Sequence, residues 1–132
     1  MAGTTIAIIG AGNGGCAIAG DMALAGHDCR LFEFPEYAGN IAPIQSTGGI
    51  EVTGIARTGF AKLALATTDL AAAVAGTEVV MVATQALSHE RTGRESAPLL
   101  QPGQAVVLWP GSGGTLVVRK VWDELGLTCL RA

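Results

Sequence analysis

The sequence predicts an α/β domain whose mainly parallel, doubly wound sheet carries a small antiparallel insertion. Short apolar segments of strand length alternate with segments in which apolar residues recur at helical spacing. The segment around residues 79–82 is apolar throughout, which is typical of a strand that helices cover on both faces. A cluster of glycines follows the first strand segment, where the chain must turn tightly into a helix. These features favour strand–helix–strand units with parallel strands.

Composition limits the chain to one folded domain and excludes several classes of function. The chain has 132 residues and a mass of 13.3 kDa, and 49% of its residues are apolar, so it can form a core. Its net charge of −3 argues against nucleic acid as a partner. No apolar run is long enough to span a bilayer, and the first five residues lack the basic region of a secretory signal. We therefore expect a cytoplasmic protein with no membrane partner.

The first half of the chain predicts one strand–helix–strand unit followed by an insertion. Residues 4–9 form a strand, residues 16–25 a helix that Gly26 closes, and residues 29–34 a second strand. Residues 36–45 are expected to form a short helix or loop, because Pro43 disfavours a continuous helix. Glycines then separate two short strand segments, which predict the antiparallel insertion at residues 48–67.

The second half returns to alternating helices and strands. Asp69 is a candidate N-cap for a helix that ends before Gly76. The segments that follow predict a strand at residues 78–83, a helix at 86–100, a strand at 105–109, a helix at 115–125 and the start of a further strand at 127–130.

The glycine-rich turn at residues 10–15, Gly-Ala-Gly-Asn-Gly-Gly, predicts a dinucleotide site and makes the expected fold Rossmann-like. Gly10 permits the tight turn, Gly12 lets the backbone approach a diphosphate, and Gly15 permits close contact between helix and strand. Free amides at the start of the helix would attract the diphosphate. The alternative is a glycine-rich turn that binds nothing.

Glu33 ends the second predicted strand, 23 residues beyond Gly10. A carboxylate at this place can accept hydrogen bonds from the hydroxyls of the adenosine ribose. A 2′-phosphate would add negative charge beside it, and the next basic residue along the chain is Arg57, so we expect NAD as the cofactor, with NADP as an alternative. The competing interpretation is a solvated carboxylate at the end of a strand.

Two further strand ends are candidate sites for the nicotinamide half of the cofactor. Ligands of open parallel sheets lie beyond the carboxyl ends of the strands. The residues at these two ends are Val82, Ala83 and Thr84, and Pro110 and Gly111.

The remaining reactive side chains are expected to have structural roles. His89 is interpreted as a surface or capping residue, with a contact to ribose or substrate as the alternative, and the widely spaced Cys16, Cys29 and Cys129 as buried, reduced thiols. Basic residues of the last two helices are expected on solvated faces, and the two tryptophans in a core or an interface: Arg91, Arg94, Arg119 and Lys120, and Trp109 and Trp122. We predict no catalytic residue and no metal site in the chain.

Several segments together resemble the N-terminal cofactor domain of the NAD/NADP-dependent octopine and opine dehydrogenase family. They are Ile8–Gly15, Gly26-His27, Leu31–Glu33, Gly48–Ile50, Ala86–His89 and Gly103–Gly111. The resemblance implies that Gly10, Gly12, Asn13, Gly14 and Gly15 hold the diphosphate, that Glu33 holds the ribose, and that the strand-end loops face the nicotinamide. Enzymes of this family join an α-keto acid to an amino acid and reduce the imine with NAD(P)H.

By the same resemblance, the helical domain that carries the family's catalytic groups is expected to lie outside residues 1–132. We therefore expect dinucleotide binding with little turnover by this chain alone, and an α-keto acid and an amino acid as partners only when a substrate domain is supplied. Other interpretations stay open. They are the cofactor domain of a ketopantoate reductase or a β-hydroxyacid dehydrogenase, a nucleotide-sensing regulatory module, and an assembly role as a homo-oligomer.

Overall fold

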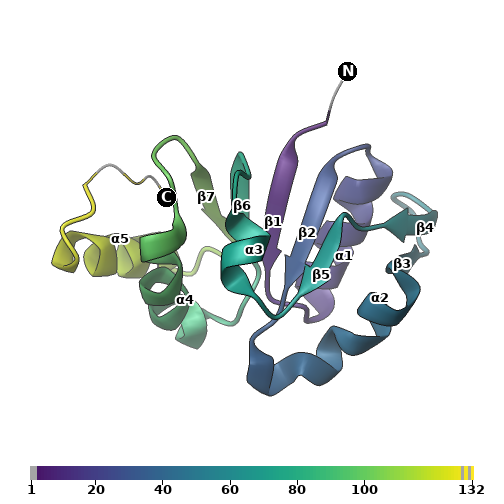
Figure 1. The fold of residues 1–132 in the computed structure, drawn as a ribbon, viewed down its shortest axis with the longest axis horizontal. Helices are drawn as coiled ribbons and strands as arrows, with labels where there is room; N and C mark the ends of the chain where they lie inside the picture. Colours follow the sequence, from purple (N-terminus) through teal and green to yellow (C-terminus); the bar gives the residue numbers. More distant parts are fainter. Residues whose placement is uncertain (1–2, 129, 131) are drawn as a thin grey trace.

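A five-stranded parallel sheet forms the centre of the computed structural model, which describes residues 3–128, 130 and 132. The strand order is β5-β2-β1-β6-β7 (Figure 1), with bounds β1 Thr5–Ile9, β2 Asp28–Phe32, β5 Leu65–Thr67, β6 Val79–Val82 and β7 Ala105–Leu108. The central strand β1 pairs in parallel with β2 on one side and β6 on the other. Strand order therefore reverses at β1, where open α/β sheets form a binding crevice at their carboxyl edge.

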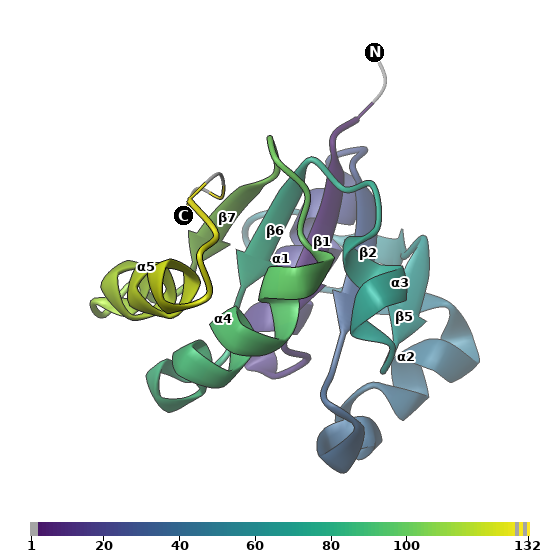
Figure 2. The same ribbon diagram turned by 60° about the vertical axis from the view of Figure 1, so that its left-hand side comes forward.

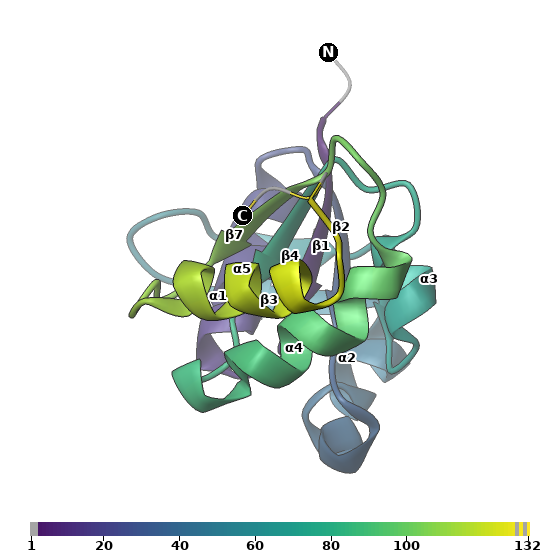
Figure 3. The ribbon, with the colours of Figure 1, turned by 90° about the vertical axis from the view of Figure 1, so that its left-hand side faces the viewer.

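Helices cover both faces of this sheet, so the doubly wound architecture is confirmed. Helix α1 (Asn13–Leu24) covers one face, and α3 (Leu70–Val74) and α4 (His89–Ser96) cover the other, with α5 (Gly114–Glu124) packed against α4 (Figures 2 and 3). Side chains of β1 alternate between the two cores. Ile6 and Ile8 pack in the core on the α1 side, and Ala7 and Ile9 in the core on the α4 side.

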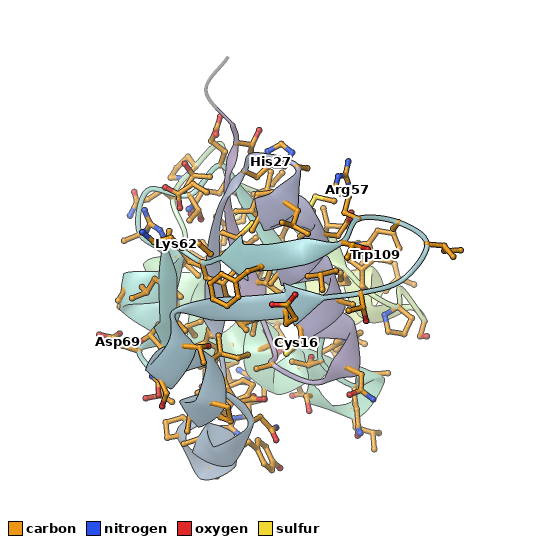
Figure 4. All side chains as sticks on the ribbon, turned by 90° about the vertical axis from the view of Figure 1, so that its right-hand side faces the viewer. Cys16, His27, Arg57, Lys62, Asp69 and Trp109 are labelled. Atoms are coloured by element: carbon orange, nitrogen blue, oxygen red, sulfur yellow. The ribbon has the colours of Figure 1, made fainter. Side chains whose placement is uncertain are left out.

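The insertion lies between β2 and β5 and contains both helical and strand segments. It begins with a 3₁₀ helix, η1 (Pro35–Asn40), and a short helix, α2 (Ala42–Thr47). Strands β3 (Gly49–Val52) and β4 (Gly59–Lys62) then pair antiparallel and lie across α1 (Figure 4). The predicted antiparallel insertion is therefore confirmed.

Residues 65–67 are an exception, because they leave the insertion and form β5 of the parallel sheet. The backbone N–H of Ala64 donates to the carbonyl of Cys29 (2.9 Å), and Leu65 then pairs with Arg30 of β2. This switch between sheets depends on a partner strand that lies more than 30 residues earlier. No glycine or proline within residues 60–67 marks it.

Two expected elements near the C-terminus differ in the structure. The expected helix at residues 86–100 is divided into η2 (Ala86–Ser88), α4 and η3 (Ala97–Leu99), and Pro98 lacks the N–H that would continue the α-helix. The expected strand at 127–130 is absent from residues 127, 128 and 130, while Cys129 lies outside the described residues. Gly126 (φ +73°) closes α5 as predicted. No helix in the described part of the chain is long and apolar enough to cross a membrane.

Candidate dinucleotide site

The turn after β1 needs glycine at two positions. Gly10 has φ +106°, and a Cβ there would lie 3.1 Å from the carbonyl oxygen of Ala83. At Gly15, a Cβ would overlap the carbonyl oxygen of Gly10. Gly15 is buried, and helix α1 therefore begins in direct contact with the turn that ends β1.

The first turn of α1 leaves backbone amides open to a ligand. Gly12 is the N-cap, and no side chain among the described residues caps it. The first α-helical bond runs from the N–H of Cys16 to the carbonyl of Gly12 (2.9 Å), so the amides of Asn13, Gly14 and Gly15 precede it. Among the described residues, no atom other than those of the chain neighbours and of the helix's own backbone lies within 4 Å of a Cβ built at Gly12 or Gly14. The space above these amides can therefore admit an anion such as a diphosphate.

Glu33 directly follows β2 and is only 5% exposed. Its Oε2 accepts hydrogen bonds from the N–H of Ala11 and from Nδ2 of Asn40, both at 3.1 Å, and its Oε1 accepts one from the N–H of Phe34 (2.9 Å). The interpretation of Glu33 as a solvated carboxylate is therefore wrong. Three of the approximately four acceptor positions of the carboxylate are occupied, and one on Oε1 is left for a ligand hydroxyl.

Asn40 is a residue of this site that sequence reasoning missed. It lies at the end of η1, seven residues after Glu33, and its side chain fixes the orientation of the carboxylate. The only signal in the sequence is a polar residue near a proline-initiated turn, Pro35, which does not reveal which side chain faces Glu33.

Gly10, Gly12, Glu33 and Asn40 border a cavity of about 270 Å³ at the carboxyl edge of the sheet, whereas Asn13, Gly14 and Gly15 do not line it. Its walls come from the turn after β1, the segment after β2 and the segment after β6, and its lining residues are Gly10, Gly12, Glu33, Phe34, Tyr37, Asn40, Ala83, Thr84, Gln85 and Ser88. The hydroxyl of Thr84 is buried and has no hydrogen-bond partner among the described residues. A buried polar atom without a partner at a cavity wall is a further place where a polar ligand can bind.

Of the predicted strand-end residues, the structure brings only some to the cavity. Ala83 and Thr84 line it, whereas Val82 is buried in the core. Pro110 and Gly111 are exposed in the loop between β7 and α5 and do not line the cavity. Any contact of this loop would therefore be with a part of the ligand that extends beyond the cavity.

Arg91 is exposed, as the sequence predicts, but its side chain also makes specific contacts with the wall of the cavity. Its guanidinium carbon stacks 4.0 Å from the centroid of the Phe34 ring, and the side chain pairs with Glu36 of η1 and with Glu95 (2.7 Å). The hydrogen bond from Arg91 is the main cause that lowers the pKa of Glu36. Arg91 therefore links η1 to α4 across the wall that contains Phe34.

His89 is completely buried, so its interpretation as a surface or capping residue is wrong. The ring lies against Gly114 at the start of α5, where a Cβ would overlap its Nδ1. Neither ring nitrogen has a partner among the described residues. Because glycine at position 114 leaves room for the ring, His89 fills space between α4 and α5 and does not face the cavity.

The described cysteines and tryptophans, for which the sequence predicts structural roles, differ in how deeply they are buried. Cys29 is buried, and burial is the main cause that raises the pKa of its thiol to about 11. Cys16 is partly exposed, and burial and then Glu33 raise the pKa of its thiol. Trp122 is buried in the core, whereas Trp109 is 54% exposed.

The cavity offers little acid–base chemistry of its own. Glu33 and Tyr37 are the titratable residues of its lining, and Glu33 is engaged by three hydrogen-bond donors. The part of the chain that the structure describes also contains no group of three or more His, Cys, Asp or Glu residues that could hold a metal ion. The arrangement is suited to binding a ligand with a diphosphate and a ribose.

Comparison with known proteins gives one relative in sequence. No protein-family model matches the chain. An opine dehydrogenase of Arthrobacter sp. (strain 1C) is 34% identical to it over 123 residues, which are 92% of this chain and 34% of the relative. The chain thus spans about a third of the length of the curated relative that it matches.

Solved structures of several dehydrogenases and reductases share the fold. A complex of octopine dehydrogenase with NADH and pyruvate has a TM-score of 0.77 at 22% identity, covering 89% of this chain and 32% of that chain. A yersinopine dehydrogenase with bound NADP⁺ has a TM-score of 0.72 at 19% identity, covering 98% of this chain and 33% of that chain. A ketopantoate reductase from Ralstonia eutropha JMP134 has a TM-score of 0.72 at 23% identity, covering 88% of this chain and 37% of that chain.

The fold and the site together define a Rossmann-type dinucleotide-binding domain. Within this class, the opine dehydrogenase relative indicates the family, because its 34% identity extends over 92% of the chain. The chain corresponds to the NAD-binding domain of the opine dehydrogenase family, as the resemblance implied.

Proposed function

We propose that this chain binds NAD(H) at the carboxyl edge of its sheet, as the cofactor domain of an opine-dehydrogenase-like oxidoreductase. One observation carries the proposal. The hydrogen bond from the N–H of Ala11 to the carboxylate of Glu33 joins the diphosphate turn to the ribose carboxylate within a single cavity. These two features sit at the switch point of the sheet, where the adenosine half of a dinucleotide binds in such folds.

The residues of the cavity suggest a place for each part of the cofactor. The amides of Asn13, Gly14 and Gly15 would hold the diphosphate, with Gly10 and Gly12 leaving room for it, as the resemblance implied. The free acceptor position on Glu33 would take a ribose hydroxyl. Ala83 and Thr84 would border the path toward the nicotinamide, and Pro110 and Gly111 would contact it beyond the cavity.

The preferred cofactor in this proposal is NAD(H), with NADP(H) as the weaker ligand. No Lys or Arg lines the cavity among the described residues. Arg30, the basic residue nearest to Glu33 in sequence, donates to the carbonyls of Ala72 and Ala75 (3.4 and 2.7 Å). A 2′-phosphate beside Glu33 would therefore meet a carboxylate without a compensating cation.

We also propose the reaction and the partners of the complete protein. The octopine dehydrogenase complex with NADH and pyruvate, and the opine dehydrogenase relative, support the reductive joining of an α-keto acid to an amino acid. Because no His, Lys or Cys lines the cavity among the described residues, and Glu33 is already engaged by three hydrogen-bond donors, the chain alone is proposed to have little turnover. Self-association is proposed through an apolar groove that includes exposed Trp109, together with Ile18, Met22 and Met81. A cytoplasmic location agrees with the free thiols of Cys16 and Cys29.

Calorimetric titration of the purified chain with NADH and with NADPH tests the proposed function. We expect saturable NADH binding, and binding of NADPH about tenfold weaker. Replacing Glu33→Gln should weaken NADH binding about tenfold, since a hydrogen bond to a charged group contributes roughly 1.5 kcal/mol or more. In an assay with NADH, pyruvate and an amino acid, the rate of NADH oxidation should not increase with the amount of protein added.

Glu78→Gln is the matched control for this experiment. Glu78 also accepts a backbone hydrogen bond, from the N–H of Thr5 (2.9 Å), but it precedes β6 at the amino edge of the sheet. NADH affinity should be unchanged in this variant, and thermal denaturation reports whether each variant is folded. Absence of NADH binding at millimolar concentration would contradict the proposed function.

A further inference from the structure

The guanidinium of Arg91 connects helix α4 to the segment after β2, which forms one wall of the cavity. Arg91 of α4 pairs with Glu36 of η1, which lies 55 residues away in sequence, and its guanidinium stacks on Phe34. Phe34 lines the cavity and donates its N–H to the carboxylate of Glu33. The guanidinium thus stacks on the residue that directly follows Glu33, the carboxylate that is proposed to hold the ribose.

Two carboxylates hold the guanidinium of Arg91, each through one of its five N–H donors. Glu36 takes Nη1 and Glu95 takes Nε at 2.7 Å. The hydrogen bonds from Glu36 and Glu95 raise the pKa of Arg91, so the guanidinium stays charged and paired. Both carboxylates are about half exposed, so this arrangement can rearrange without disturbing the core.

A phosphate on the 2′-hydroxyl of the ribose requires a free cation at this place. In dinucleotide domains of this fold, an arginine near the end of the second strand accommodates the 2′-phosphate. Arg91 has the side chain for this contact and stacks on Phe34 of the cavity wall, but it is paired with Glu36 and does not line the cavity. Glu36 also adds a second negative charge three residues after Glu33 in the sequence.

We propose that Glu36 is a specificity-determining residue, which selects against NADP(H) by holding Arg91 in an ion pair over Phe34. This inference rests on the proposed function, because it requires that the adenosine ribose bind at Glu33. Release of Arg91 would let its guanidinium form the charge-assisted bidentate contact that a phosphate favours. The contact with NADH, which has no 2′-phosphate, would not depend on this release.

Titration of Glu36→Gln with NADH and NADPH tests the inference. We expect NADPH affinity to rise about fivefold to tenfold, while NADH affinity changes by less than about twofold. The control is Glu90→Gln, which removes the same charge from the neighbouring position on α4 and breaks only the exposed pair with Arg94 (3.2 Å). This control should leave the ratio of the two affinities unchanged.

A double-mutant cycle separates release of Arg91 from a simple loss of negative charge. In the Arg91→Gln background, Glu36→Gln should raise NADPH affinity by less than about twofold. An equal rise with and without Arg91, or no rise in the single variant, would overturn the inference while NADH binding upholds the proposed function. Failure of the original chain to bind either cofactor would overturn both.

Discussion

At the scale of single residues, Glu33 combines a structural and a proposed binding task. Its carboxylate satisfies the backbone N–H groups of Ala11 and Phe34, which would otherwise be buried without partners. Asn40 supplies a third donor and fixes the carboxylate in one orientation. A carboxylate held in this way needs little reorganisation when it accepts a hydroxyl.

Cys29 gives a residue-scale prediction about stability and pH. Burial raises the pKa of its thiol from 9.0 to about 11, so the folded state keeps the proton longer than the unfolded state. This contribution to the free energy of unfolding is fully present below pH 9 and is lost as the pH rises toward about 11. Denaturant unfolding at about pH 8 and about pH 10 should therefore show a decline on the order of 1 kcal/mol from this group.

Two variants isolate that contribution. Cys29→Ala should lower stability at both pH values but reduce its decline with pH, whereas Cys16→Ala, at a partly exposed site, should retain the decline due to Cys29. A pH dependence in Cys29→Ala equal to that of the original chain would show that Cys29 does not titrate as described.

Residues whose roles are local were predictable, and residues whose roles depend on distant partners were not. The conformation of Gly10 and the burial of Cys29 follow from the neighbouring sequence. The sequence does not reveal the burial of His89, because that burial depends on Gly114. It does not reveal the role of Asn40 either, because its side chain reaches Glu33 only after a 3₁₀ turn. Hydrophobic spacing does not encode either contact.

At the scale of elements, the start of α1 is the feature on which the site depends most. The helix packs against the turn after β1 so closely that its third residue must be glycine, and its first amides face open space. The same close contact sets the direction of the amides toward the carboxyl edge. Changes at neighbouring positions of this turn should therefore have opposite effects.

Gly15→Ala and Gly14→Ala form a matched pair that tests this contact. Alanine at position 15 would overlap the Gly10 carbonyl and should destabilise the fold by about 2–3 kcal/mol or more. Alanine at position 14 meets no atom within 4 Å and should stabilise the helix by about 0.5–1 kcal/mol. Urea denaturation measures both, and equal effects of the two substitutions would contradict the described contact.

Most elements could be predicted from periodicity and turn residues, with errors where tertiary contacts decide. The sequence places residues 65–67 in the insertion because they continue an apolar run without a break, yet they form β5 and pair with β2. The helix expected at residues 86–100 is divided because Pro98 and the turn at residues 86–88 interrupt regular hydrogen bonding.

At the scale of the whole molecule, the order of the strands determines where the site lies. Reversal of strand order at β1 brings the ends of β1, β2 and β6 together, although they are far apart in sequence. Alternating strand and helix segments predict this doubly wound class, and the glycine turn predicts which edge is used. The contact between η1 and α4 through Glu36 and Arg91 could not be predicted, since nothing local links residues 55 positions apart.

The most direct test of the central claim is to map NADH binding on the amide resonances of the isotopically labelled chain. We expect shifts to concentrate at the carboxyl edge, at Gly12, Gly14 and Phe34, and to leave Gly76 and Gly103 at the amino edge unchanged. Shifts concentrated at the amino edge, or no shifts at millimolar NADH, would contradict the claim that this domain binds a dinucleotide through its glycine turn and Glu33.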